Sequence, residues 1–184
     1  MGFVLLGFLA GRAGSDAFSG FVGVGSAFYY VIIYAITTLA SFGVILAMSH
    51  TGFEADQIDD LKGLNKRNPW LAFLVLVVMF SLAGIPPLVG FFAKFVILKG
   101  LIQSGHIGLS VLAVMFSLIG AFYYLRVVKV MYFDKPETES AIAFSPIHHL
   151  VLSVNVLALL ALGILPAGLI NMAINSVLKS LGAA

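Results

Sequence analysis

Apolar residues run through this chain in long stretches, and polar residues are confined to short segments between them. The apolar stretches cover residues 27–49, 70–104, 107–130 and 147–174, with a shorter one at residues 1–11. A helix needs about 20 apolar residues to cross the hydrocarbon core of a bilayer. The pattern therefore predicts an all-α integral membrane protein, a single membrane domain with about four transmembrane crossings and an N-terminal helix remnant.

The first stretch, Met1–Ala10, is too short to cross a bilayer, because ten helical residues reach only about 15 Å. It also lacks the basic region that opens a secretory signal peptide. We therefore expect the end of a helix whose beginning is missing. The following residues, Gly11–Ser26, are rich in glycine and serine and carry no helical stripe, so they are expected to form a connector.

The longest stretch, residues 70–104, would reach about 50 Å as one straight helix, too long for an ordinary crossing. A proline lacks a backbone donor and disfavours the helical conformation in the residue before it. A break is therefore expected at Gly84–Pro87. Two arrangements fit: one crossing made of the half-helices Trp70–Ala83 and Leu88–Ser104, or two short crossings that turn at the prolines. The last stretch is expected to bend near Gly163–Pro166.

The positions of the basic residues favour the single broken crossing. In that arrangement the polar connectors at residues 50–68 and 134–146 lie on the same side of the membrane. That side then holds Lys62, Lys66, Arg67, Arg126, Lys129 and Lys135. Lysine and arginine are enriched on the cytoplasmic side of membrane proteins, whereas two crossings would divide this cluster equally.

Composition supports a membrane protein and excludes several other classes. Hydrophobic residues make up 61% of the chain and charged residues only 10%, against about 25% charged in soluble domains. A net charge of +2 is too small to suggest a nucleic-acid partner. The chain has no cysteine, which excludes disulfides and thiolate metal sites. It shows no nucleotide-binding loop or nucleophile–base pattern, so direct catalysis on a small molecule has no support.

Lys94 is the principal candidate for chemistry, because it lies about 15 Å in from the end of its stretch, near the middle of the membrane. An ammonium group at that depth costs roughly 2.5–3.5 kcal/mol. Burial disfavours its charged form, so it could take up and release a proton. Gly84 and Gly90 would permit irregular backbone and water beside it. A structural lysine that snorkels to an interface is the alternative, and the residues alone leave both open.

Lys99 and His106 are secondary candidates. Lys99 lies on a different face of the same stretch and is expected to anchor it at the interface rather than relay protons. His106 could hand protons onward, since imidazole titrates at about pH 6.5, but solvent contact in a turn is the simpler explanation. His148–His149 are expected at the interface, and no set of side chains has the spacing of a metal site.

Three stretches resemble the antiporter-like subunits of proton-pumping NADH:quinone oxidoreductase, respiratory complex I. SLAGIPPLVGFFAKF (81–95) is similar to the signature of their lysine-bearing broken helix. That signature alone would also admit the related subunits L and M and cation/proton antiporters. FYYVIIYAITTLASFGVILAM (28–48) and GAFYYLRVVKVMYFDKP (120–136) resemble subunit N, the counterpart of mitochondrial subunit 2.

The resemblance implies a bundle of about fourteen helices with two inverted half-channels, and it matches Lys94 to the lysine of the second half-channel. It covers only about the last two-fifths of that subunit. The glutamate and the central lysines of the first half have no counterpart here. A truncated product, a split subunit and an isolated segment remain open.

The resemblance also implies a multi-pass protein of the bacterial cytoplasmic membrane. Its expected partners are the lipid bilayer, the other membrane-arm subunits and a missing N-terminal half, with no nucleic acid. Quinone, NADH, flavin and iron–sulfur centres would belong to other subunits, and no cofactor or metal is expected in this chain.

The leading hypothesis is a proton-translocating subunit of this oxidoreductase, without catalytic activity of its own, in which Lys94 is the protonatable relay. One alternative is a subunit of a cation/proton antiporter or of a membrane-bound hydrogenase. The other is a structural remnant that assembles without pumping.

Overall fold

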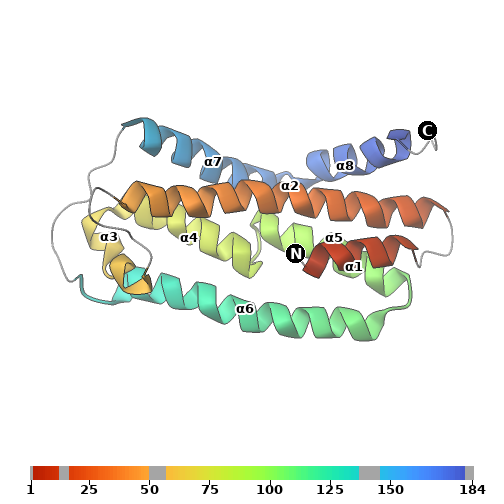
Figure 1. Ribbon diagram of the computed structural model, residues 1–184, viewed down its shortest axis with the longest axis horizontal. Coiled ribbons are helices and arrows are strands. Elements are labelled where there is room, and N and C mark those ends of the chain that lie inside the picture. Colours follow the sequence, from red (N-terminus) through yellow and green to blue (C-terminus); the bar gives the residue numbers. More distant parts are fainter. Residues whose placement is uncertain (1, 13–16, 50–56, 137–145, 181–184) are drawn as a thin grey trace.

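The computed structural model describes residues 2–12, 17–49, 57–136 and 146–180. Within these ranges the chain is helical and contains no strand, which confirms the all-α prediction, and most helices follow one long axis (Figure 1). The helices are α1 (Gly2–Arg12), α2 (Ala17–Met48), the 3-10 helix η1 (Ile58–Leu61), α3 (Leu64–Arg67), α4 (Pro69–Ala83), α5 (Val89–Gln103), α6 (Ile107–Phe133), α7 (Pro146–Ile164) and α8 (Pro166–Ser180). Residues 50–56 and 137–145 of the predicted polar connectors lie outside the described residues.

The first predicted connector is wrong over most of its length. α2 begins at Ala17, inside the expected connector Gly11–Ser26 and ahead of the expected span 27–49. The glycines there bring helices together rather than form a loop. A Cβ atom added to Gly25 would lie 2.8 Å from the Cα atom of Ile174 in α8. Small residues allow such close helix packing in membranes, so the glycine-rich composition indicated helix contact.

The predicted break between α4 and α5 is confirmed. Asn68 caps the start of α4 by accepting the Leu71 N–H at 3.0 Å, with Pro69 as the first helical residue. α4 ends at Ala83, and α5 begins at Val89. The two follow one another along the long axis (Figure 1), and α2 and α6 each contact both. This arrangement is one broken helix rather than a hairpin.

The remaining spans agree broadly with the sequence pattern. α6 runs three residues beyond the predicted end at residue 130. The last span is divided, because α7 ends at Ile164 and α8 begins at Pro166. Among the described residues, three stretches are long and apolar enough to cross a membrane: Gly20–Leu46, Ile107–Phe133 and Pro146–Ile164. Pro69–Ala83, helix α4, is a shorter apolar helix, and α5 follows it after the break.

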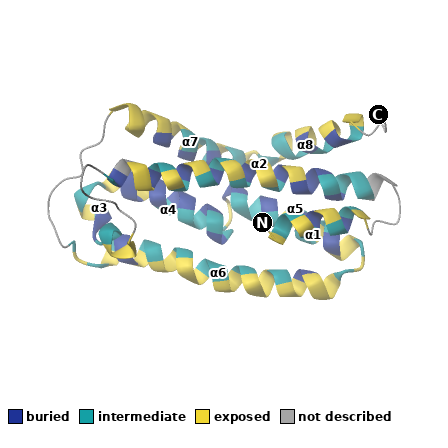
Figure 2. Ribbon diagram, in the orientation of Figure 1, coloured by how far each residue is buried: buried dark blue, intermediate teal, exposed yellow. Residues whose placement is uncertain are grey.

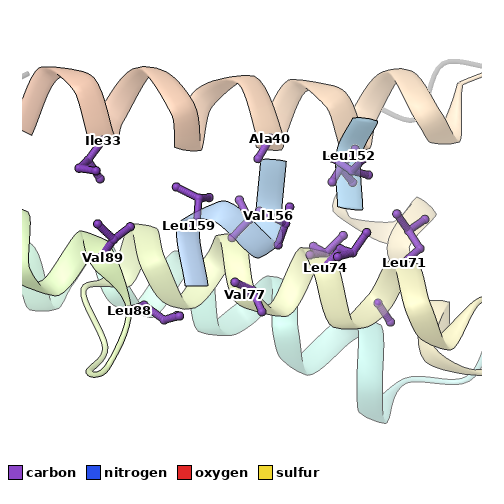
Figure 3. Packing of buried hydrophobic residues seen from close by; sticks show 14 of the residues in the cluster. Ile33, Ala40, Leu71, Leu74, Val77, Leu88, Val89, Leu152, Val156 and Leu159 are labelled. Atoms are coloured by element: carbon purple, nitrogen blue, oxygen red, sulfur yellow. The ribbon is translucent and has the colours of Figure 1, made fainter. Parts of the chain in front are cut away.

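The core lies where α2, α4, α5 and α7 meet. Figure 3 shows Ile33 of α2, Val77 of α4, Val89 of α5 and Leu159 of α7 pointing into this region. In lipid the hydrophobic effect does not drive helices together, so close packing of such side chains holds them. α6 is exposed along much of its length (Figure 2). The core therefore fixes the break of α4–α5 from one side, and α6 covers it from the other.

Basic residues gather at one end of the bundle. The Gly63 N–H, between η1 and α3, donates to the Val130 carbonyl near the end of α6 at 3.2 Å. α3 therefore lies against the last turns of α6, at the left of Figure 1. We call this the basic end; it carries Lys62, Lys66, Arg67, Arg126, Lys129 and Lys135. The two polar connectors thus begin or end on the same side, as the charge pattern predicts.

Candidate functional site

The C-terminus of α4 is closed by a glycine cap. Gly84 adopts φ +83°, and its N–H donates to the Ser81 carbonyl at 3.1 Å. The Ile85 N–H donates to the Phe80 carbonyl at 3.0 Å. Together these bonds form a Schellman motif. The last four carbonyls of a helix lack partners within it. The cap satisfies the first two of them and leaves the final two.

Lys94 satisfies those two remaining carbonyls. From α5, its Nζ atom donates to the carbonyls of Leu82 at 3.0 Å and Ala83 at 3.1 Å. It also donates to the hydroxyl of Ser117 on α6, at 2.8 Å. An ammonium group has three donors, and all three are used. The half-buried lysine therefore joins α4, α5 and α6 at the break.

Neutral groups supply the electrostatic environment of this ammonium group. The two carbonyls are the negative end of the α4 dipole, which favours a cation. The Phe3 ring of α1 lies 5.8 Å from Nζ, close enough for a cation–π contact. None of the described helices α1, α2 or α4–α8 contains Asp or Glu. A buried carboxylate left without its cationic partner would be costly. Loss of the lysine proton leaves no such carboxylate in these helices.

Glycines permit the close approach of three helices at the break. A Cβ atom on Gly90 would collide with the Ser81 carbonyl, while the Gly90 N–H donates to the Ser81 hydroxyl at 3.3 Å. A Cβ atom on Gly163 of α7 would lie 2.6 Å from the Pro87 carbonyl. α4 and α7 therefore pack against the break and the start of α5, which positions Lys94.

A cavity of about 320 Å³ adjoins Lys94, between α1, α2, α4, α5 and α6. Apolar side chains form part of its wall. Its polar lining consists of Tyr30, Tyr34, Thr37, Ser81, Ser117 and Tyr124, besides Lys94 itself. The relay candidate thus faces a space with hydroxyl groups on three helices.

The secondary candidates lie apart from this cavity. Lys99 is exposed and borders a different cavity of about 500 Å³ between α5 and α6, lined mainly by apolar side chains. The Nδ1 atom of His106 lies 3.0 Å from the Ser104 carbonyl, in the turn before α6. Neither borders the cavity beside Lys94. His149 stacks on Trp70, with ring centroids 6.4 Å apart. The roles of Lys99, His106 and His149 stay predictions.

Ser117 is the contact that sequence reasoning missed. A serine in an apolar helix gives no signal by itself. However, Ser110, Ser117 and Tyr124 recur every seven residues, which places them on one face of α6. The structure turns that face toward α5 and the cavity, since Ser110 is buried while Ser117 and Tyr124 line the cavity. This spacing could have identified the face.

Residues 1–120 match the family model described as NADH:quinone oxidoreductase/Mrp antiporter, TM. This match covers more than half of the chain, which therefore belongs to that family of membrane proteins. No group of three or more His, Cys, Asp or Glu suited to a metal occurs in the part of the chain that the structure describes.

Within this family the chain is similar to NADH-quinone oxidoreductase subunit N, as the resemblance predicts. It is 54% identical to that of Herminiimonas arsenicoxydans over 182 residues, which is 98% of this chain and 37% of the relative. It is 51% identical to that of Nitrosomonas europaea over 181 residues, which is 98% of this chain and 36% of the relative. The chain thus spans a little over a third of the length of these relatives.

Two solved assemblies share the fold. One is respiratory complex I from Thermus thermophilus with bound aureothin, with a TM-score of 0.71 and 25% identity. It covers 92% of this chain and 43% of the matched chain. The other is the membrane-bound sulfane sulfur reductase, an archaeal respiratory membrane complex, with a TM-score of 0.72 and 18% identity. The match covers 95% of this chain and 40% of the matched chain. At 18% identity the likeness concerns the fold alone.

Proposed function

We propose that this chain is a proton-translocating part of the membrane arm of an NADH:quinone oxidoreductase, with Lys94 as the protonatable relay. The observation that carries this is the position of its Nζ atom. It lies at a helix break, held by three neutral acceptors and facing a hydroxyl-lined cavity. Oxidation of NADH and reduction of quinone would occur in other subunits.

The contacts of Lys94 suit both of its protonation states. As an ammonium group it donates to two carbonyls and to the Ser117 hydroxyl. After losing a proton, the amine keeps two N–H donors for the carbonyls and gains a lone pair. A carbonyl can only accept, but the Ser117 hydroxyl can reverse and donate to that lone pair. The site can therefore hold either state without moving its backbone.

A charge on a neighbouring subunit could drive the transfer. A unit charge about 10 Å from Nζ changes its energy by roughly 1.7 kcal/mol at an effective dielectric constant of about 20. Each 1.36 kcal/mol is about tenfold in proton affinity. A change of charge at that distance would thus move the proton balance of Lys94 by more than tenfold. A partner subunit that changed its charge at such a distance could therefore couple to Lys94.

The partners we propose are the other membrane-arm subunits and the remaining part of subunit N, which this chain does not span. The apolar helices fit a multi-pass protein in the bacterial cytoplasmic membrane, with the basic end on the cytoplasmic side. Exposed apolar side chains along α6 are suited to lipid or to such partners.

An antiporter subunit is the second candidate, because the matching family model includes Mrp antiporters. It would exchange a metal cation for a proton. The positive charge of Lys94 opposes a bound cation beside it, which favours protons alone. Transport that depends on sodium would support the antiporter instead.

The test compares two lysines of the same helix. Lys94→Ala and Lys99→Ala would each be introduced into the assembled complex in its native membrane. We expect Lys94→Ala to abolish proton pumping and to lower quinone reductase activity, whereas Lys99→Ala should retain both. Co-purification of the other subunits would establish that each variant assembles. Undiminished pumping and quinone reduction in Lys94→Ala would refute the relay.

A further inference from the structure

We propose that Phe3 is a positioning residue for the relay, because its aromatic ring stabilises the ammonium form of Lys94 over the amine form. The ring would thereby set how readily the lysine gives up its proton. This inference rests on the proposed relay function and adds a residue of α1 to it, whereas the hydrogen-bond acceptors of Lys94 lie on α4 and α6.

The Phe3 ring faces Lys94 within the cavity at the break. Nζ lies over the ring, 5.8 Å from its centroid, and both side chains line the same cavity. Both are half-buried, so water screens their contact less than it would at an exposed site. The face of an aromatic ring is negative and attracts a cation placed over it. The ring therefore favours a charged lysine.

This contact depends on the charge of the lysine. The hydrogen bonds to Leu82, Ala83 and Ser117 weaken when the proton is lost, but an amine can keep them. Towards the ring, an amine keeps at most a weak N–H···π contact. A cation–π contact at a half-buried site contributes about 1 kcal/mol, which is about fivefold in the ratio of ammonium to amine.

A seam of small residues between α1 and α2 fixes the helix that carries the ring. Gly7 and Gly11 are four residues apart, on one face of α1. A Cβ atom added to Gly7 would lie 2.9 Å from the Cβ atom of Ala27, and one added to Gly11 would lie 2.8 Å from the Gly20 carbonyl oxygen. Small residues permit such close approach of helices in membranes. Phe3 lies about one turn before Gly7, so the seam also places the ring.

The other contacts of α1 hold the ring independently of the charge on Lys94. Tyr30 of α2 stacks on Phe3 with ring centroids 5.7 Å apart, and Tyr34 stacks on Tyr30 at 6.2 Å. Further along α1, Ala10 packs against Ile97 of α5, the helix that carries Lys94. The ring is thus positioned by packing against α2 and α5, and it would stay in place when the lysine loses its proton.

Other charged groups lie away from the cavity. Besides Lys94, the charged or basic side chains on the described residues of α1, α2, α4, α5, α6 and α7 are Arg12, Lys99, Arg126, Lys129, His148 and His149. None of these lines the cavity. The other titratable groups that do line it are the hydroxyls of Tyr30, Tyr34 and Tyr124. Tyrosine is neutral at about pH 7, so a change of charge in the cavity near that pH belongs to Lys94.

Two phenylalanines of α1 provide the test and its control. Phe3→Leu removes the ring over Lys94 and keeps an apolar side chain. Phe8→Leu makes the same change where the side chain is 45% exposed and does not line the cavity. Phe3→Tyr keeps a ring at the site. For each variant, the complex is assembled with this chain labelled at the lysine Nζ atoms with nitrogen-15. Solid-state NMR in the membrane then measures the ratio of ammonium to amine for Lys94 at a series of pH values.

We expect the ratio at a given pH to be about fivefold lower in Phe3→Leu than in Phe8→Leu, and to recover in Phe3→Tyr. Equal ratios in Phe3→Leu and Phe8→Leu, including a signal that stays ammonium in both, would overturn the inference. A higher ratio in Phe3→Leu would overturn it too, since it would show that water entering the vacated space outweighs the ring. Failure of Phe3→Tyr to restore the ratio would assign the effect to packing instead of the ring.

Proton pumping separates this inference from the relay itself. The relay needs the ammonium form, which is lost as pH rises, so pumping by Phe3→Leu should decline at a lower pH than pumping by Phe8→Leu. Coincident pH profiles would contradict the role of the ring. If Lys94→Ala pumps normally, the relay fails even where Phe3→Leu lowers the ratio. If Lys94→Ala is inactive while Phe3→Leu and Phe8→Leu give equal ratios, only the role of Phe3 is refuted.

Discussion

Gly84→Ala tests whether the geometry of the break controls Lys94. Gly84 has φ +83°, a conformation that costs a residue with a Cβ atom about 1–2 kcal/mol. The added Cβ atom would also lie 3.1 Å from Nζ and 3.2 Å from Cδ of Lys94. Favourable contacts between carbon atoms begin at about 3.5 Å, so the lysine would have to retreat by roughly 0.3–0.4 Å.

That retreat would weaken bonds that Lys94 now makes at 2.8 to 3.1 Å. A hydrogen bond to a charged group contributes about 1.5–3 kcal/mol, and partial loss of one bond would cost about 1 kcal/mol. The expected total for Gly84→Ala is therefore about 2–3 kcal/mol. Gly105→Ala is the matched control, because Gly105 has φ +80° but nothing lies within 4 Å of its added Cβ atom. It should cost only the backbone term of about 1–2 kcal/mol.

Two assays on the assembled complex separate these effects. The thermal unfolding midpoint should fall in both variants, and further in Gly84→Ala. Protons pumped per NADH oxidised should fall in Gly84→Ala alone, because only that change displaces Lys94. Equal pumping by the two variants would refute the claim that the cap of α4 positions Lys94 for the proposed relay.

Three further changes follow from the described contacts. Ser117→Ala removes the one acceptor of Lys94 that can also donate; if Lys94 is the relay, we expect pumping to fall several-fold while assembly persists, and unchanged pumping would contradict this. Gly163→Ala would force α7 away from the break at a cost of about 1–3 kcal/mol and lower the unfolding midpoint. Gly168→Ala in α8, with nothing within 4 Å of its Cβ atom, should not lower the midpoint and should raise it slightly, because alanine favours a helix more than glycine does. Trp70→Phe removes the bond from Nε1 to the Ser153 hydroxyl at 2.9 Å. The free energy of unfolding should fall by about 0.6 kcal/mol and the midpoint only slightly; a loss of several kcal/mol would contradict this.

The membrane class and the broken helix could be predicted from the sequence, and Lys94 could be singled out as a candidate, because each depends on local chemistry. Pro86 and Pro87 cannot continue a helix wherever they occur. A lysine in a long apolar stretch is likewise recognised by its own depth, before its partners in the fold are known. The division of the last span near Gly163–Pro166 followed from the same kind of local signal.

The start of α2 and the contacts of Lys94 could not be predicted in the same way. Glycines at residues 20, 23 and 25 are compatible with a loop or with close helix packing, and only the position of α1 and α8 decides between them. The acceptors of Lys94 come from α4 and α6, and two of them are backbone carbonyls that no residue type reveals. For Ser117, the seven-residue spacing from Ser110 and Tyr124 was the only signal in the sequence.

The protonation state of Lys94 itself tests the central claim most directly. The complex, with this chain labelled at the lysine Nζ atoms with nitrogen-15, would be followed by solid-state NMR in its membrane, with and without NADH and quinone. The signal of Lys94 is the one missing from Lys94→Met. The relay predicts that this signal alone alternates between ammonium and amine forms when turnover begins. An Nζ atom of Lys94 that stays an ammonium group under every condition would contradict it.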